Sequence, residues 1–187
     1  MEKNALGITH DYIRRLVQPG DTVIDATAGN GNDTLFLAQL VGEAGRVYAF
    51  DIQPQAIENT KNKLEQAGMI DRVTLLLDGH QNMKQYVTQP VKAVMFNFGY
   101  LPGGDHSICT KSETSIQAIS AAMDLISEDG MVMLAIYYGG DSGFEEKDAL
   151  MAFLKGIDCH RYSVLRHDFI NYPNCPPIAV GIVKEER

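Results

Sequence analysis

The sequence contains no tryptophan and only three cysteines, Cys109, Cys159 and Cys175, among its 187 residues. Three scattered cysteines cannot build a disulfide framework, which indicates a reducing compartment. They do not form a zinc pattern either. Histidines lie near Cys109 and Cys159, but the sequence has no Cys-x-x-Cys pair, so we expect no metal.

Long apolar runs and an excess of basic residues are also absent. No 18 consecutive residues are apolar, and charge interrupts the N-terminal segment throughout, so we expect a cytoplasmic protein without membrane association. Sixteen Lys and Arg residues against 24 Asp and Glu residues give a net charge of −8. This balance disfavours non-specific coating of nucleic acid, which requires many phosphate contacts. It leaves open a local basic patch that docks one structured RNA.

The chain shows neither repeats nor a linker, so residues 1–187 are expected to form one domain. Strand-like segments alternate with amphipathic ones. The last two strands have no helix between them, which predicts an α/β, Rossmann-like, seven-stranded, mostly parallel sheet. One antiparallel strand lies in a C-terminal hairpin, and helices cover both faces. The expected strands are 22–26, 46–52, 73–78, 92–97, 131–138, 160–169 and 177–184. The expected helices are 6–17, 34–41, 54–67, a short one around 83–87, and one behind each capping box, Thr110–Glu113 and Ser142–Glu145.

A turn rich in glycine and asparagine, DATAGNGND, follows the first strand at residues 25–33. Its glycines permit a tight turn and close approach of a ligand, and Asn32 or Asp33 can cap the next helix, whose amides favour an anion. Asp51 ends the second strand, where a carboxylate can accept hydrogen bonds from ribose hydroxyls. A plain tight turn is the alternative. The predicted cofactor-binding residues here are Asp25, Gly29, Asn30, Gly31, Asn32, Asp33, Asp51, Ile52 and Gln53.

Two cofactors fit an acidic residue at the end of the second strand. A dinucleotide site needs a third glycine where Thr34 stands, and Asp33 would repel a diphosphate. S-adenosylmethionine instead offers a carboxylate, an ammonium group and a ribose without phosphate, so it is favoured. The end of the third strand is predicted to lie beside the adenine, although a simple turn, with His80 on the surface, is the alternative. The residues concerned are Asp78, Gly79, His80 and Gln81.

The segments TVIDATAGNGND, FDIQ and LLLDGHQ, with the helix-free terminal hairpin, resemble class I S-adenosylmethionine-dependent methyltransferases. Thr27 departs from the common motif, which has glycine there. More closely, DATAGNGNDT, YAFDIQ, NFGYLPGGD and NYPNCPP together resemble a bacterial family long labelled rRNA methylases. Its members (MnmM-type enzymes) methylate the amino group of 5-aminomethyl-2-thiouridine at the tRNA wobble position. The resemblance implies a tRNA anticodon stem-loop as partner and S-adenosylhomocysteine as product.

The fourth predicted strand stops at Asn97, inside VMFNFGYLPGGD. Residues at the carboxyl ends of central strands face the ligand crevice, so Asn97 is expected beside the methyl donor. Asn-Phe-Gly-Tyr resembles the Asn-Pro-Pro-Tyr motif of methyltransferases that act on exocyclic amines. A carboxamide oxygen can accept an amine N–H and orient the nitrogen lone pair. Asn97, Tyr100 (stacking on a flipped base) and Asp105 are the predicted catalytic residues, and Asn97 is also predicted to bind the cofactor.

The acceptor side leaves several alternatives open. An alkylamine is mostly protonated near neutral pH, and His106 and His167 are further candidates, with Asp105, for the base. The same centre could methylate an rRNA or small-molecule amine. A nucleotide-binding dehydrogenase or a non-catalytic domain is disfavoured by the missing glycine and the terminal hairpin. Without a separate RNA-binding domain, the catalytic domain, alone or as a homodimer, is expected to form the RNA surface. Its candidate basic residues are Arg14, Arg15, Lys111, Arg161 and Arg166.

Overall fold

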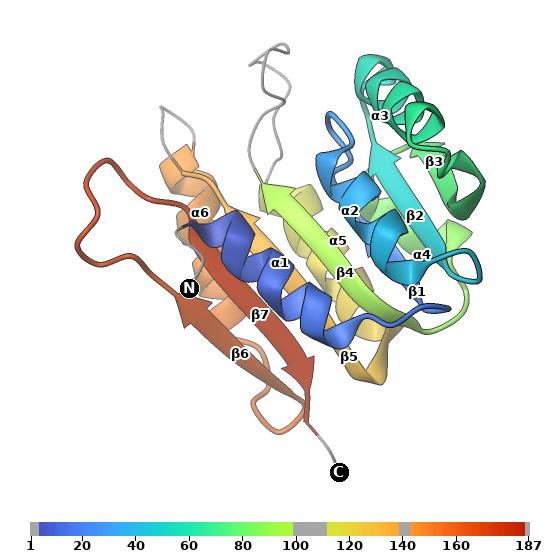
Figure 1. Ribbon diagram of the computed structural model, residues 1–187. Coiled ribbons are helices and arrows are strands. Elements are labelled where there is room, and N and C mark those ends of the chain that lie inside the picture. The colour runs from blue at the N-terminus through green and yellow to red at the C-terminus, as the bar shows by residue number, and fades with distance from the viewer. Residues whose placement is uncertain (1–3, 99–111, 139–142, 186–187) are drawn as a thin grey trace.

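The computed structural model describes residues 4–98, 112–138 and 143–185, which form a seven-stranded sheet covered by helices (Figure 1). The strand order is β3-β2-β1-β4-β5-β7-β6. Strands β1 to β5 pair in parallel, whereas β7 is antiparallel to both of its neighbours. The bounds are β1 Thr22–Asp25, β2 Arg46–Asp51, β3 Val73–Leu77, β4 Val91–Phe98, β5 Ile126–Ile136, β6 Tyr162–His167 and β7 Ile178–Lys184. The predicted sheet with one antiparallel strand in a C-terminal hairpin is confirmed.

Helices lie on both faces of this sheet, as predicted (Figure 1). One core packs α1, α2 and α3 against one face, and the other packs α4, α5 and α6 against the opposite face. Neighbouring strand residues alternate between the cores: Val23 and Met95 join the first, whereas Ile24 and Phe96 join the second. The bounds are α1 Ala5–Leu16, α2 Asn32–Val41, α3 Pro54–Gln66, α4 Met83–Tyr86, α5 Ser112–Leu125 and α6 Gly143–Lys155, with single 3₁₀ turns at Ile70–Arg72 and His80–Asn82. No helix in the described ranges is long and apolar enough to cross a membrane.

Local sequence explains where several helices begin. Asn4 caps α1, since its side-chain oxygen accepts a hydrogen bond from the Gly7 amide at 2.7 Å. Pro54 occupies the first turn of α3, where its missing N–H has no cost. Helix α2 begins after Gly31, which has no capping side chain, so the predicted cap by Asn32 or Asp33 is wrong. Both residues lie inside the first turn of α2 instead.

The largest shift in a predicted boundary concerns β5, which begins five residues earlier than expected. Helix α5 ends at Leu125 and the strand starts at once, with Ile126 opposite Val91. The pairing then slips, because Met131 lies opposite Ala93, so the intervening residues form an irregularity at the start of the strand. β5 also ends at Ile136, so Tyr137 and Tyr138 follow the strand rather than finish it. Thr110 and Ser142, the first residues of the two predicted capping boxes, lie outside the described residues.

Candidate active site

The turn between β1 and α2 is held against α3 at the carboxyl edge of the sheet. Gly29 and Gly31 both have positive φ angles, +54° and +75°, which L side chains rarely adopt. A Cβ on Gly31 would lie 2.8 Å from the Cα of Thr60 in α3, and the Thr60 hydroxyl donates to the Gly29 carbonyl at 3.1 Å. The turn therefore needs glycine at position 31 both for its backbone conformation and for its distance from α3.

Gly31→Ala is expected to destabilise the fold more than a matched change, Gly68→Ala. Gly68 has a similar φ of +66°, but a Cβ there would meet nothing within 4 Å. Gly68→Ala should cost about 1–2 kcal/mol from backbone strain, whereas Gly31→Ala adds a further ~1–3 kcal/mol from the clash with Thr60. Urea unfolding of the three proteins measures both values. Equal losses would show that the approach to α3 imposes no constraint.

Asparagines reinforce the same contact between the turn and α3. The Asn59 amide donates to the Asn30 side-chain oxygen at 2.9 Å, and the Lys63 ammonium donates to the Asn32 side chain. Asn30 and Asn32, both predicted to bind the cofactor, thus also attach the turn to the neighbouring helix. A turn fixed at several points in this way presents its amides in one arrangement.

Asp51 and Gln53 follow at the end of β2, one strand away. The Asp51 carboxylate accepts from the amides of Gly29 and Gln53, each at 2.9 Å, one to each oxygen. Each carboxylate oxygen keeps a second lone pair, so two hydroxyl donors can still bind. Asp51 therefore joins the ends of β1 and β2 and remains able to hold a ribose.

Two exposed aliphatic residues lie on the carboxyl edge beside Asp51. Ile52 is 58% exposed and Leu77 is 56% exposed, and Leu77 pairs directly with Asp51 across β2 and β3. Exposed side chains of this kind offer an apolar wall for a flat ring such as adenine. From the sequence, Ile52 was predicted as a cofactor-binding residue. Leu77 was missed, because an aliphatic residue in an apolar strand gives no sign of being exposed.

Beyond β3 lie the four residues predicted to lie beside the adenine; Asp78 and Gln81 contact residues nearby in the chain, whereas His80 contacts the segment after β1. The Asp78 carboxylate accepts from Asn82 at 2.9 Å, from Tyr86 at 2.8 Å and from the Gly79 amide at 2.7 Å, and these bonds lower its pKa. His80 donates from Nδ1 to the Ala26 carbonyl at 3.1 Å, and burial lowers its pKa. The side chain of Gln81 folds back over Gly79.

Asp25 is a fully buried carboxyl beneath the turn. It accepts from the Thr34 hydroxyl at 2.6 Å and from the Thr27 amide at 3.1 Å. Burial, followed by the charge of nearby Asp33, raises the pKa of Asp25 to about 7. Asp25 therefore supports the turn from below.

This raised pKa predicts how stability changes with pH. Because the folded-state pKa lies above the unfolded value, the folded protein retains a proton that the unfolded chain has lost between about pH 4 and pH 7. The contribution of Asp25 to stability therefore falls as pH rises through that window, by at most about 1.4 kcal/mol per pH unit. Asp25→Asn removes the titration, so the stability of the wild type relative to this variant should decline from pH 5 to pH 8 in urea unfolding. A difference independent of pH would contradict this.

Asn97 is the penultimate residue of β4, one position before the end of the strand, and it faces the turn after β1. Its backbone amide donates to the Thr27 hydroxyl at 2.8 Å, which gives a structural reason for threonine where the common motif has glycine. Its side-chain NH₂ donates to Asp33. The side-chain oxygen, Oδ1, is buried and has no hydrogen-bond partner within the described part of the chain. Because an unsatisfied buried acceptor is costly, a donor supplied to this oxygen by a ligand would be stabilising.

Asp33 has a second partner that the sequence did not reveal, His10 of α1. The imidazole Nε2 lies 2.7 Å from Asp33 Oδ1, and the ring stacks on Phe36 at 4.1 Å. Asp33 is only 7% exposed. These residues form a chain of hydrogen bonds from α1 through α2 to β4, with the free Asn97 oxygen at its end.

The other predicted acceptor-side residues are only partly described. Tyr100, Asp105 and His106 lie outside the described residues. His167, at the end of β6, contacts Tyr12 of α1, with the hydroxyl 3.2 Å from Nε2. Tyr137 lies close enough to Asp33 that burial and this charge together raise its pKa.

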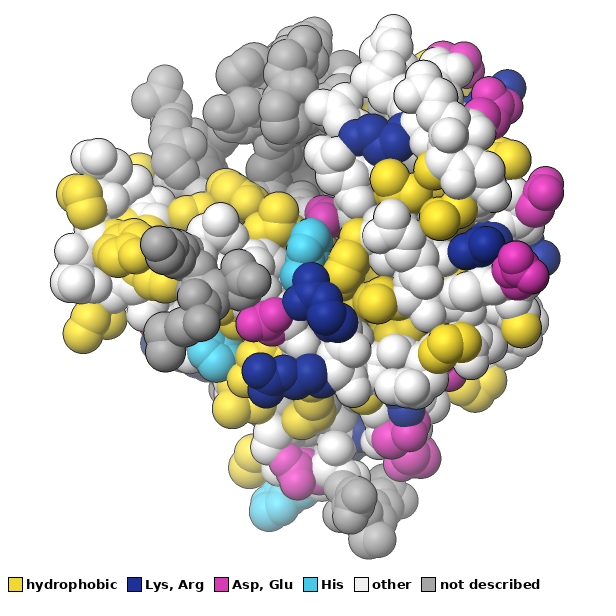
Figure 2. Space-filling model, in the orientation of Figure 1, with side chains coloured by type: hydrophobic (Ala, Val, Ile, Leu, Met, Phe, Trp, Pro, Cys, Tyr) yellow, Lys and Arg dark blue, Asp and Glu magenta, His cyan; other side chains and the backbone are white. Residues whose placement is uncertain are grey.

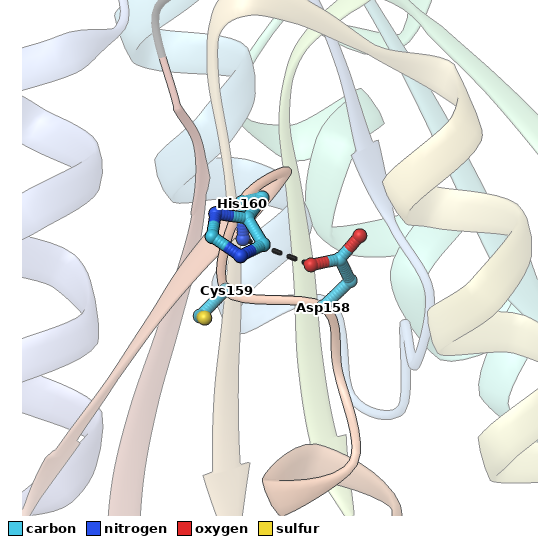
Figure 3. A group of neighbouring side chains, drawn as sticks. All are labelled: Asp158, Cys159 and His160. Carbon is cyan, nitrogen blue, oxygen red and sulfur yellow. Dashed lines mark hydrogen bonds between the residues drawn. The ribbon is translucent and has the colours of Figure 1, made fainter.

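Asp158, Cys159 and His160 lie together in the turn before β6 (Figure 3). Their potential ligand atoms lie within 4.8 Å of one another and all three residues are exposed. They are consecutive, and the hydrogen bonds of the turn, such as His160 N–H to Asp158 at 2.9 Å, account for their proximity. Nothing further in the described chain points to a metal there.

The geometry fits S-adenosylmethionine. Asp51 retains lone pairs for ribose hydroxyls, and Ile52 and Leu77 provide an apolar wall. The buried carboxylate of Asp33, in the first turn of α2, favours an ammonium group and would repel a diphosphate. At the end of β4, the buried side-chain oxygen of Asn97 can accept a hydrogen bond from a ligand.

The sheet order, the antiparallel β7 and this site define a class I S-adenosylmethionine-dependent methyltransferase. The chain belongs to the rRNA methylase family, because the model described as "Putative rRNA methylase" matches residues 47–183. A chloroplastic tRNA (mnm5s2U34)-methyltransferase of Arabidopsis thaliana is 38% identical over 195 residues, which cover 99% of this chain and 71% of that protein.

Two solved structures are similar over nearly the whole chain. A protein from Clostridium thermocellum, described as an rRNA methylase, has a TM-score of 0.97 and 61% identity over 99% of this chain and all of that one. A protein from Streptococcus mutans, described as "a putative methyltransferase" and solved in complex with SAH, has a TM-score of 0.91 and 39% identity with the same coverage. The predicted cofactor is therefore confirmed at the level of the family.

Proposed function

We propose that this methyltransferase acts in the cytoplasm on the amino group of 5-aminomethyl-(2-thio)uridine at the wobble position of tRNA. The observation that carries the proposal is the buried, unpaired Oδ1 of Asn97 at the carboxyl end of β4. The name of the Arabidopsis relative, which specifies this wobble uridine, supports the choice of substrate.

When bound, S-adenosylmethionine supplies a methyl group on a good leaving group, so the protein's main task is orientation. The Asn97 oxygen accepts an N–H of the acceptor amine and thereby directs the nitrogen lone pair. Alignment of this kind can supply roughly 7 kcal/mol or more of the rate enhancement. Asp33 holds the carboxamide, because its carboxylate accepts the Asn97 NH₂ group.

An alkylamine must also lose a proton before it can accept the methyl group. Its ordinary pKa, by analogy with lysine, is about 10, and an apolar setting favours the neutral form. Asp105 is proposed as the group that takes the proton, and Tyr100 as a stacking partner of the base.

Exposed apolar side chains beside the site support a nucleobase substrate. Tyr137 follows β5 and Phe144 is the second residue of α6, while Ile170 and Tyr172 lie in the β6–β7 loop, which emerges at the same edge of the sheet (Figure 1). Single-stranded RNA is commonly held by bases stacked on such aromatic rings.

The basic side chains support RNA binding less strongly than the exposed apolar side chains do. Figure 2 shows Lys and Arg in small separate groups on the visible face. Arg14 pairs with Asp11 at 2.8 Å, and Arg166 with Asp168 at 2.8 Å. This distribution supports recognition of one anticodon stem-loop through its bases more than through many phosphates. We also propose that the protein forms a homodimer, which would double this small basic surface.

The family description favours one second candidate, an rRNA amine. The test is methyl transfer by the purified protein to three substrates: an anticodon stem-loop that carries 5-aminomethyl-2-thiouridine, the same stem-loop with plain uridine, and ribosomal RNA. Transfer only to the first is expected. Transfer to ribosomal RNA alone would overturn the tRNA assignment while the methyltransferase class still holds.

A further inference from the structure

His10 of α1 is a half-buried histidine that no role in cofactor or substrate binding explains. Its side chain is 22% exposed, and its ring lies flat on Phe36, with an angle of 18° between the planes. The guanidinium of Arg14 lies 5.4 Å from the centre of the Phe36 ring. The imidazole is therefore fixed by stacking, with Nε2 directed at Asp33.

The hydrogen-bond chemistry of this chain of residues permits one arrangement. The Asp33 carboxylate can only accept, so His10 must donate from Nε2 and Asn97 must present its NH₂ group. The Asn97 carbonyl oxygen is then necessarily turned away from Asp33, and it is the atom left buried without a partner. If the amide turned over, its oxygen would face a carboxylate, which is repulsive.

We propose that His10 is a positioning residue for methyl transfer: through Asp33, it holds the Asn97 carboxamide with its oxygen toward the acceptor amine. This inference rests on the proposed role of Asn97. His10 fixes one carboxylate oxygen of Asp33, so the other oxygen remains in place for the Asn97 NH₂ group. The Thr27 hydroxyl accepts from the Asn97 backbone amide, so the side-chain torsions of Asn97 are what the His10–Asp33 pair has to set.

Two substitutions separate the hydrogen bond from the packing. His10→Phe keeps an aromatic ring on Phe36 but removes the donor, whereas His10→Gln keeps a donor near the Nε2 position but removes the ring. A hydrogen bond to a charged group is typically strong enough that its loss should lower kcat roughly ten- to hundredfold. We expect His10→Phe to show this fall while its affinity for S-adenosylhomocysteine changes less than about threefold. His10→Gln should retain kcat within about fivefold of the wild type.

A packing role predicts the reverse order, with His10→Phe active and His10→Gln impaired, and that result would overturn the proposal. Equal activity of His10→Phe and wild type would also overturn it. If circular dichroism shows that His10→Phe does not fold, His10→Leu replaces it, with the same expectation. Kinetic coupling provides a second test: His10→Phe combined with Asn97→Ala should be no slower than Asn97→Ala alone. An additional fall equal to that of His10→Phe would show that His10 does not act through Asn97.

A measurement without substrate distinguishes failure of this inference from failure of the proposed function. In the free protein, the two side-chain N–H resonances of Asn97, assigned by their loss in Asn97→Ala, should be separated and protected from exchange with water. In His10→Phe they should move toward the values of an exposed asparagine, and in His10→Gln they should not. Unchanged resonances in His10→Phe would contradict the positioning role, whatever RNA the wild type methylates.

Discussion

Asn97→Ala should reduce methyl transfer by roughly 10²–10³-fold or more, because it removes the acceptor that orients the amine nitrogen. The affinity for S-adenosylhomocysteine should stay within a few-fold of the wild type, since the turn after β1 and Asp51 keep their contacts with each other. Single-turnover kinetics on the modified anticodon stem-loop, together with calorimetry, measure the two quantities separately.

The matched control is Asn62→Ala. Asn62 is an exposed residue of α3 whose side-chain amide donates within its own helix, to Glu58 at 3.4 Å. The Asn62→Ala variant should retain full methyl-transfer activity. A fully active Asn97→Ala protein would remove Asn97 from the chemistry. A variant that loses cofactor affinity as well as activity would show that Asn97 supports the cofactor site as a whole.

Asp51→Ala should weaken binding of S-adenosylhomocysteine by roughly 10²-fold or more. Two effects add: the ribose hydroxyls lose a charged acceptor, and the amides of Gly29 and Gln53 lose their partner, which loosens the turn. Calorimetry on the purified protein measures the change. Because Asp51→Ala leaves Asp33 and Asn97 in place, the residual activity at saturating cofactor should fall much less than in Asn97→Ala.

The control for Asp51→Ala is Asp71→Ala, an exposed carboxylate in the 3₁₀ turn before β3, which should bind normally. The wild-type protein should show no heat of binding with NAD. Unchanged S-adenosylhomocysteine affinity in Asp51→Ala would contradict the predicted ribose contact, and binding of NAD would contradict the cofactor assignment itself.

Features encoded by local patterns were predicted well from the sequence. The alternation of strands and helices, and the absence of a helix in the final hairpin, were enough to predict the order of elements and the antiparallel β7. The start of β5 was not predicted, because Ser127, Glu128, Asp129 and Gly130 are polar or flexible. Their inclusion in a strand comes from pairing with β4 through a slipped register, which is not a local property.

The features of the site also divide into those that local sequence could predict and those that it could not. Asp51 and the glycine turn could be predicted because carboxyl ends of parallel strands meet at one edge. Contacts between distant segments could not: His10 is 23 residues from Asp33, and Thr27 is 70 residues from Asn97. Histidine in an amphipathic helix and threonine in a turn are both ordinary, and only the tertiary structure reveals that each contacts a residue of the predicted site.

The most direct test of the proposed substrate is mass spectrometry of tRNA nucleosides from cells that lack the gene. We predict that 5-aminomethyl-2-thiouridine accumulates and that its methylated form disappears. A copy of the wild-type gene should reverse both changes, whereas the Asn97→Ala copy should not. If wobble aminomethyl-uridine does not accumulate and the methylated nucleoside persists, the substrate assignment is wrong, although the fold and the cofactor site stand.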